Sequence, residues 1–257
     1  MQDSTFDLPR YLAALPLFKD TAPDALAHIA AGSRLRRFDR GDMVFRLGEP
    51  CVEFYVAVFG QVKLFALSAG GQEKVFELVG PGMTFAEAPM FVGGMHRVNG
   101  QALADTLLLA VGKPVVLDEI VRDPALALRM LSGLSRRLHR LMDDVEAYAL
   151  HSGLRRVADF LLRGLDRSAP GPHTLALPAS KATIALRLSL TPEYFSRVLH
   201  QLEDAGLIRI DKRSITIPSP ECLRAFSSLG SDGAAAPVCP NGQCAHYMAT
   251  QRATATR

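Results

Sequence analysis

The sequence predicts an α+β fold: an N-terminal antiparallel β-barrel or jelly-roll, then one long helix, then a helical region that ends in a β-hairpin. Three observations predict it. Glycine turns recur about every eight to twelve residues between residues 35 and 111, apolar residues follow a three-and-four spacing after residue 123, and two short helical patterns precede a hairpin within residues 180–218. A chain of 257 residues that is 48% hydrophobic can bury two modest cores.

The N-terminal part alternates short apolar runs with glycine turns, as the strands of an antiparallel barrel or sandwich do. Runs rich in Val, Phe and Tyr occupy residues 52–59, 62–67 and 74–79. A short helical pattern at residues 22–31 precedes the strands. We therefore expect a β domain over residues 15–117.

A long helix is predicted after the β domain, over residues 118–150. Pro124 fits a first helical turn, and the apolar residues that follow alternate steps of three and four over nearly three heptads. These positions are Leu131, Leu134, Leu138, Leu141, Val145 and Tyr148. An apolar stripe needs a partner, so one interpretation pairs two copies of the chain through this helix. The other packs the helix on its own barrel.

The most specific pattern follows, and it predicts a winged helix-turn-helix over residues 151–223. Residues 180–188 fit a short helix, residues 188–190 a tight turn, and Thr191-Pro192 the capped start of a second helix. The second helix has an apolar face (Phe195, Leu199, Leu202) and a polar face (Glu193, Ser196, Arg197, His200). A hairpin with basic residues at its tip comes next.

This arrangement predicts DNA binding, because a recognition helix must present polar side chains to base edges while its other face stays anchored. Arg197 can donate two hydrogen bonds to guanine O6 and N7, Glu193 can accept from a cytosine or adenine amino group, and Ser196 can donate or accept. The predicted contacts to the DNA backbone are Thr191, His200, Lys212, Arg213 and Lys181. The alternative is a solvent-facing amphipathic helix followed by an ordinary hairpin.

Composition narrows the class of protein. No run of about eighteen apolar residues occurs, and the N-terminus lacks the basic and apolar regions of a signal peptide, so we expect a cytoplasmic protein that spans no membrane.

An enzyme on a cupin-like barrel is not expected, because the barrel region holds one histidine, His96, and no metal triad. Residues 228–257 are rich in small and polar residues and predict a disordered tail.

The segment Glu193-Tyr194-Phe195-Ser196-Arg197 resembles the Glu-x-x-Ser-Arg form of the Fnr-like branch of the Crp/Fnr family, and the resemblance covers residues 15–223. It implies an effector-sensing β-roll of the cyclic-nucleotide-binding type, a dimerisation helix and a winged helix-turn-helix domain. It also implies a homodimeric transcription regulator that binds a TTGAT-like inverted repeat in double-stranded DNA. RNA polymerase is a further implied partner if the protein is an activator.

Residues 85–91 resemble the ligand-binding segment of the family's barrel. Glu87 matches the ribose-binding glutamate and Arg97 the phosphate-binding arginine, whereas Ala86 replaces a glycine and Val98 replaces the serine whose hydroxyl meets the phosphate. The predicted effector pocket comprises Phe85, Glu87, Met90 and Arg97. Two alternative functions stay open for the protein: a regulator that responds to a cyclic nucleotide, and a nucleotide-sensing module that does not bind DNA.

The same segment is similar to the denitrification regulators that respond to nitric oxide, a resemblance that implies haem as the cofactor. The candidate haem ligands are His28, His96, His139 and Cys51. No cysteine precedes Cys51, so the N-terminal cysteine group of the family's iron–sulfur sensors is not expected. Towards the C-terminus, Cys222, Cys239, Cys244 and His246 could supply three thiolates and an imidazole to zinc or a cluster.

Overall fold

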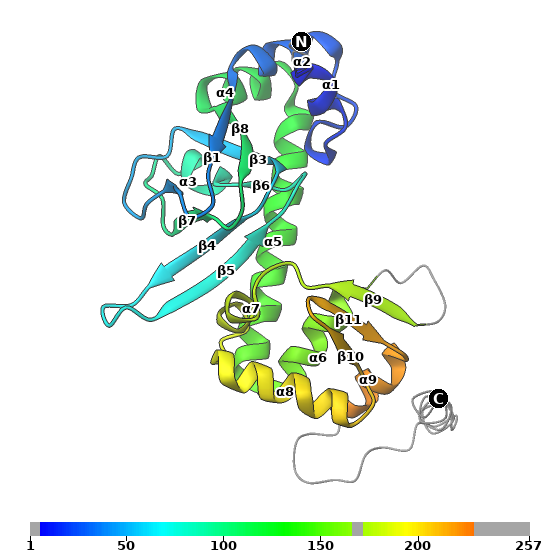
Figure 1. Ribbon diagram of the computed structural model, residues 1–257. Helices are drawn as coiled ribbons and strands as arrows, with labels where there is room; N and C mark the ends of the chain where they lie inside the picture. The colour runs from blue at the N-terminus through cyan, green and yellow to red at the C-terminus, as the bar shows by residue number, and fades with distance from the viewer. Residues whose placement is uncertain (1–5, 166–171, 229–257) are drawn as a thin grey trace, which may run out of the picture. The chain divides into compact units, whose positions relative to one another are not determined.

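The computed structural model describes residues 6–165 and 172–228. The chain divides into two compact units between Met142 and Asp143 (Figure 1). The first unit contains two four-stranded antiparallel sheets, and the second a three-stranded sheet with helices. The predicted α+β architecture of β-roll, long helix and winged helix-turn-helix is confirmed. The tail predicted over residues 228–257 lies, beyond its first residue, outside the described residues.

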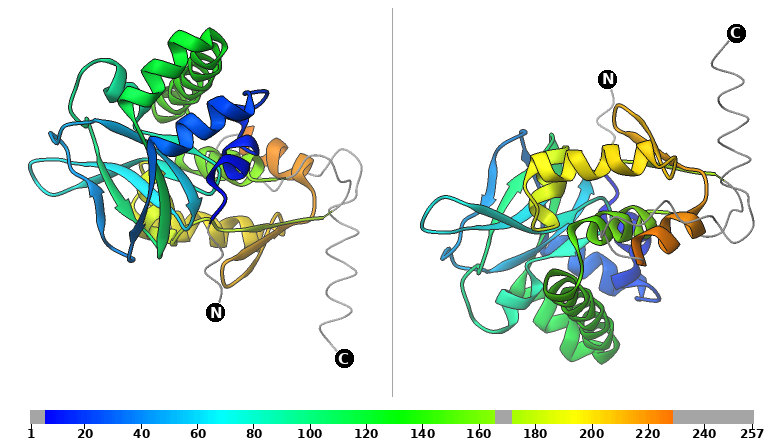
Figure 2. Two further views of the ribbon diagram at one scale, coloured as in Figure 1. Left: turned by 90° about the horizontal axis from the view of Figure 1, so that it is seen from above. Right: turned by 90° about the horizontal axis from the view of Figure 1, so that it is seen from below.

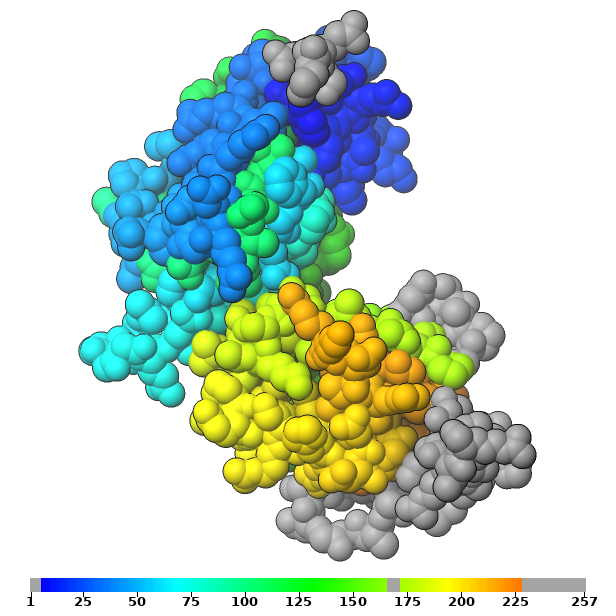
Figure 3. All heavy atoms as spheres, viewed as in Figure 1, coloured from blue at the N-terminus to red at the C-terminus, as the bar shows by residue number. Residues whose placement is uncertain are grey.

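The first unit holds the N-terminal helices, both sheets and most of the long helix. Its elements are α1 (Leu8–Ala13), the 3-10 turn η1 (Pro16–Phe18), α2 (Pro23–Ala31), β1 (Ser33–Phe38), β2 (Met43–Phe45), β3 (Glu53–Phe59), β4 (Val62–Leu67), β5 (Glu73–Val79), β6 (Thr84–Phe85), α3 (Glu87–Phe91), β7 (Asn99–Ala102), β8 (Thr106–Gly112), α4 (Lys113–Arg122) and α5 (Pro124–Leu150). The sheet orders are β1-β8-β3-β6 and β2-β7-β4-β5. The β4–β5 hairpin projects from the unit, and residues 68–72 at its tip are exposed (Figures 1 and 3).

Two clusters of buried side chains form the core of this unit. One draws on strands of both sheets, and within it the ring of Phe85 lies 5.2 Å from that of Tyr55 and 6.1 Å from that of Phe45. The other packs the N-terminal helices, α4 and the start of α5 against β3 and β8, with Leu12, Ile29 and Leu126 almost fully buried. The second cluster ties the beginning of α5 to the β-roll by apolar contact.

The long helix begins later than the predicted range of residues 118–150, because residues 113–122 form a helix of their own. Asp123 is extended, with φ −130°, as expected of a residue before proline. Its carboxylate accepts the N–H of Ala125 at 3.0 Å, and Pro124 occupies the first position of α5. The break between α4 and α5 is therefore set by the Asp-Pro pair.

The second unit contains the last part of α5 and the winged helix-turn-helix. Its further elements are α6 (Gly153–Arg163), β9 (His173–Ala176), α7 (Lys181–Arg187), α8 (Pro192–Asp204), β10 (Arg209–Asp211), β11 (Ser214–Ile217) and α9 (Pro220–Ser228), and the sheet order is β10-β11-β9. Gly153 allows α6 to approach α8 closely, because a Cβ atom at this position would lie 2.3 Å from Cε1 of Tyr194.

Candidate DNA-binding and effector sites

Helix α8 is capped and anchored as the sequence predicts. Thr191 is extended, its hydroxyl oxygen accepts the N–H of Tyr194 at 3.2 Å, and Pro192 opens the helix. The apolar face is buried, with Phe195, Val198, Leu199 and Leu202 each exposing 2% or less of their surface. The turn before α8 passes through Ser189, whose φ is +55°. These contacts fix the orientation of α8 within its unit.

The opposite face of α8 is open to solvent. Glu193, Arg197 and His200 are exposed, and Ser196 is half-buried. Seen from below, α8 lies in full view along its length, and no other helix or strand of its own unit covers it (Figure 2, right). The side chains predicted to contact bases therefore share one accessible helix face, which is the requirement for reading the major groove.

The predicted contacts to the DNA backbone lie on three elements. Lys212 stands in the left-handed region (φ +54°) at the tip between β10 and β11, where it is exposed. Arg213 follows it and donates to the carbonyl of Leu177 at 3.2 Å, so its guanidinium also braces the wing. Lys181 begins α7 and is half-buried. A flexible cation at the wing tip is suited to a phosphate.

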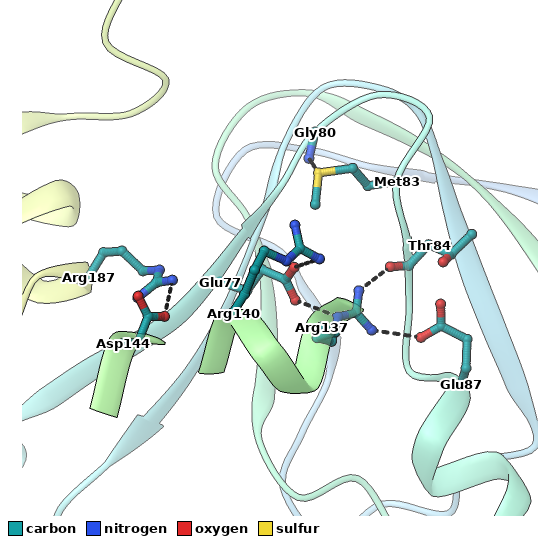
Figure 4. A network of polar contacts seen from close by, with 9 residues as sticks. All are labelled: Glu77, Gly80, Met83, Thr84, Glu87, Arg137, Arg140, Asp144 and Arg187. Atoms are coloured by element: carbon teal, nitrogen blue, oxygen red, sulfur yellow. Dashed lines mark hydrogen bonds and ion pairs between the residues drawn. The ribbon is translucent and has the colours of Figure 1, made fainter. Parts of the chain in front are cut away.

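Sequence reasoning missed the polar contacts that hold the helix-turn-helix on α5. Asp144, whose side chain is 8% exposed, pairs with Arg187 at the end of α7 (Figure 4), and the Tyr148 hydroxyl donates to the Arg187 carbonyl at 2.8 Å. Arg156 on α6 donates to the carbonyl of Leu188 at 2.7 Å. In the sequence, the one feature that could have indicated these contacts is Asp144, an acidic residue beside the apolar stripe of α5.

The apolar stripe of α5 is largely unpaired within the chain. Leu131, Leu138, Leu141 and Val145 are between 42% and 65% exposed, and Leu134 is half-buried. In the described residues this stripe is thus not packed on the barrel, which was the alternative interpretation. Tyr148 departs from the stripe, because its hydroxyl bonds to α7.

In the β-roll, Glu87 is buried and engaged by a residue that sequence reasoning did not single out. Arg137 of α5 donates from Nη1 to Glu87 at 2.9 Å and from Nη2 to the carbonyl of Thr84 (Figure 4). Its Nε lies 3.1 Å from the carboxylate of Glu77, although the N–H does not point at that oxygen. Glu87 therefore helps to tie the β-roll to α5.

The residues of the predicted effector pocket differ in burial. Phe85 and Met90 are fully buried core residues near Glu87, whereas Arg97 is exposed. A cavity of about 720 Å³ lies in the same unit beside α5, and of the four residues predicted for the effector pocket only Glu87 lines it. Arg97, the residue that matches the phosphate-binding arginine, does not line this cavity.

The four haem candidates have different surroundings, and only the segments that hold Cys51 and His96 are shown to pair with each other, through the bridge between Pro50 and Met95. His28 on α2 has a buried Nε2 without a hydrogen-bond partner, and His139 on α5 is exposed. His96 stacks on Phe45 with ring centroids 3.7 Å apart, and Cys51 Sγ lies 3.4 Å from two backbone carbonyl oxygens. Burial raises the pKa of the Cys51 thiol, which disfavours the thiolate that binds iron.

None of these side chains lines the cavity beside α5, whose described wall contains no histidine or cysteine. The residues present there do not fit a haem held through those ligands. Over the described residues, no group of three or more His, Cys, Asp or Glu side chains could hold a metal ion. Of the C-terminal candidates, Cys222 is buried in α9, and Cys239, Cys244 and His246 lie outside the described residues.

His96 should make the stability of the first unit depend on pH. Burial lowers its pKa below the ordinary value, and the opposing effect of Glu49 and Glu53 is smaller. The unfolded chain takes up the proton below about pH 6.5 while the folded chain resists it, so the free energy of unfolding falls as the pH drops through this range. Urea unfolding at about pH 7.5 and 5.5 measures the loss. His96→Phe keeps an aromatic ring stacked on Phe45, so its free energy of unfolding should fall less between the two pH values. An equal fall in the variant and the unchanged protein would show that His96 is not the group responsible.

Comparison with known proteins agrees with this organisation. A model of the Crp-like helix-turn-helix domain matches residues 155–226, and a model of the cyclic nucleotide-binding domain matches residues 35–123. The cyclic AMP receptor protein of Thermus thermophilus is 30% identical over 202 residues, which is 79% of this chain and 92% of that protein. The nitrogen fixation regulation protein FixK of Rhizobium meliloti is 29% identical over 198 residues, or 76% and 89% of the two chains.

Solved structures share the fold. FixK2 from Bradyrhizobium japonicum superposes with a TM-score of 0.68 at 25% identity, covering 77% of this chain and 99% of that one. CooA from Carboxydothermus hydrogenoformans, in a mutant form, gives a TM-score of 0.70 at 19% identity, covering 88% and 97%. None of the helices in the described part of the chain combines the length and apolar character needed to cross a membrane.

The fold, the exposed face of α8 and these matches define a DNA-binding transcription regulator with an N-terminal effector-binding domain. The matched relatives are regulators, and the prediction that the chain is not an enzyme is confirmed. Within this class the chain belongs to the Crp/Fnr family.

Proposed function

We propose that the protein acts as a homodimer that reads an inverted repeat with TTGAT-like half-sites and is controlled by an effector bound in its N-terminal unit. One observation carries the proposal: α8 buries four apolar side chains on one face and leaves Glu193, Arg197 and His200 exposed on another. A helix anchored in this way can enter the major groove with its polar N-terminal residues leading.

Sequence reading rests on the first two turns of α8. Arg197 donates two hydrogen bonds to O6 and N7 of the guanine in each half-site, and Glu193 and Ser196 contact the neighbouring bases. Contacts from Thr191, His200, Lys212, Arg213 and Lys181 to phosphates set the register of the protein on the duplex.

The homodimer forms through the exposed stripe of α5. An inverted repeat presents two identical half-sites, and a two-fold dimer would place its recognition helices about 34 Å apart, one turn of DNA. The exposed Leu138, Leu141 and Val145 supply the apolar surface that such pairing buries.

The effector acts in the N-terminal unit, where Arg137 joins the β-roll to α5. A ligand shifts the regulator only if it binds the DNA-competent conformer better than the other. Neither haem nor a cyclic nucleotide is part of the proposal. The cavity beside α5 lacks histidine and cysteine in its described wall, and Arg97, the residue matching the phosphate-binding arginine, is exposed and does not line it.

Replacing Arg197 by glutamine tests the base-reading role. We expect the affinity for a duplex with TTGAT half-sites to fall by about 1–3 kcal/mol, and discrimination against duplexes with the guanine replaced to fall with it. Fluorescence anisotropy with both duplexes at fixed salt measures the two affinities.

Lys212→Gln provides the contrast, because the exposed wing-tip lysine is assigned to a phosphate. It should weaken binding to both duplexes alike and lower the salt dependence by about one charge. If Arg197→Gln also weakens both duplexes alike, Arg197 does not read the guanine.

A further inference from the structure

The cavity beside α5 has a wall built from three segments far apart in the sequence. They are residues 15–20 around η1, residues 82–84 at the start of β6, and residues between 128 and 140 on α5, with Glu87 beside them. Its volume of about 720 Å³ lies within the range of small-molecule sites. All of these residues belong to the first unit.

Two arginines of α5 hold this wall in place. Arg129 donates to the Leu17 carbonyl at 2.9 Å and to the Thr21 hydroxyl at 3.1 Å, which fixes the η1 segment against α5. Arg137 fixes the opposite side through Glu87 and the carbonyl of Thr84. The cavity is therefore formed by directed hydrogen bonds before any ligand binds.

The charges around the cavity do not balance. Its wall carries five cationic side chains, Lys19, Arg129, Arg136, Arg137 and Arg140, against the carboxylates of Asp20 and Glu87.

Three of the five cations are available to a ligand. Among the described residues, the side chains of Lys19 and Arg136 make no ion pair or hydrogen bond. Arg140 approaches only Glu77, at 3.8 Å, and its side chain is 58% exposed (Figure 4). Unpaired cations around a concave site attract anions and shorten the search for them.

We infer that this cavity binds a small polyanion, a metabolite that carries two or more carboxylate or phosphate groups, and that this molecule is the effector. The inference rests on the proposal that an effector acts in the N-terminal unit. Lys19, Arg136 and Arg140 donate charge-assisted hydrogen bonds to the anionic groups. The site differs from the position marked by Arg97, which does not line the cavity.

An anion at this position also reaches the contacts between β5 and α5. Glu77 on β5 faces both Arg137, at 3.1 Å, and Arg140, at 3.8 Å (Figure 4). A polyanion competes with Glu77 for these guanidinium groups. Its binding therefore weakens the ion pairs between β5 and α5, and this couples the effector site to the position of α5.

Calorimetric titration of the full-length protein with citrate and with inorganic pyrophosphate tests the inference. We expect at least one to bind with one site per chain, and Arg136→Gln/Arg140→Gln to weaken it by at least about tenfold. The probe that binds more tightly tells a carboxylate site from a phosphate site. Arg37→Gln/Arg46→Gln is the matched control, because it removes two exposed arginines beside a separate depression of the β-roll, and it should bind as the unchanged protein does.

Two results overturn the inference: binding of neither anion, or equal binding by the unchanged protein and the Arg136→Gln/Arg140→Gln variant. Lys19→Gln keeps the test valid if the double variant does not fold, since it should weaken binding too. Anisotropy with duplex DNA is measured in parallel. Specific DNA binding without anion binding overturns the anion site and leaves the proposed function standing. Anion binding without specific DNA binding overturns the proposed function and leaves the anion site standing.

Discussion

Replacing Leu138 and Leu141 by aspartate is expected to yield a monomer that no longer binds the inverted repeat specifically. The two leucines are 58% and 42% exposed on α5, so the change should disturb the folded chain little. Pairing two such helices would bury carboxylates in an apolar seam, which is strongly unfavourable. Without the second recognition helix, affinity for the full site should fall by at least about a hundredfold. Sedimentation equilibrium and fluorescence anisotropy measure the two losses.

His139→Asp is the control, because it places a carboxylate on an exposed position of the same helix, one residue beyond stripe position Leu138 and outside the lining of the cavity beside α5. It should remain dimeric and bind the repeat. The assignment of the dimer interface fails if the leucine variant remains dimeric, or if its monomer binds the full site as tightly as the unchanged protein.

The elements that were predictable from sequence have local patterns. Thr191-Pro192 predicts a capped helix start, and the structure places the Thr191 hydroxyl on the N–H of Tyr194. The three-and-four spacing after Pro124 predicts a single long helix, and α5 runs over 27 residues. In each case the structure is determined by residues within a few positions of one another, so the local sequence pattern is enough to predict it.

The contacts that tie elements together were not predictable in this way. Arg137 reaches Glu77 and Glu87, which lie about fifty to sixty positions earlier in the chain. In the sequence, Arg137 is one arginine among several on the polar side of a helix, and nothing local distinguishes it from its solvent-exposed neighbours. Its role depends on where the β-roll places two carboxylates, which is a property of the tertiary structure.

The surroundings of Glu87 in the predicted effector pocket were not predictable from sequence for the same reason. The resemblance identifies Glu87 by its place in a motif, and in the structure its carboxylate is buried and accepts a hydrogen bond from Arg137. A motif does not say which cation faces the carboxylate. Here it is Arg137 of α5, and the substitutions at Ala86 and Val98 already signalled that this barrel departs from the nucleotide-binding pattern.

Replacing Asp144 by asparagine is expected to destabilise the second unit and loosen α7. Asp144 pairs with Arg187, and the two side chains are 8% and 21% exposed, so the neutral variant removes the negative charge that this largely buried guanidinium faces. Breaking a pair of this kind should cost about 2–4 kcal/mol, towards the lower end because Arg187 keeps the Tyr148 hydroxyl as a partner. Hydrogen exchange of the full-length protein should show faster exchange in residues 181–188, and specific DNA affinity should fall.

Asp143→Asn removes the same charge from the exposed neighbouring position and should change neither exchange nor affinity. The double variant Asp144→Asn/Arg187→Gln separates the pair from its surroundings. It should be less destabilised than the sum of the two single variants, because the favourable interaction between the two charges is lost only once. If Asp144→Asn behaves as Asp143→Asn does, the ion pair does not hold α7 on α5. Attachment of the helix-turn-helix would then rest on the hydrogen bonds of Tyr148 and Arg156 and on apolar packing.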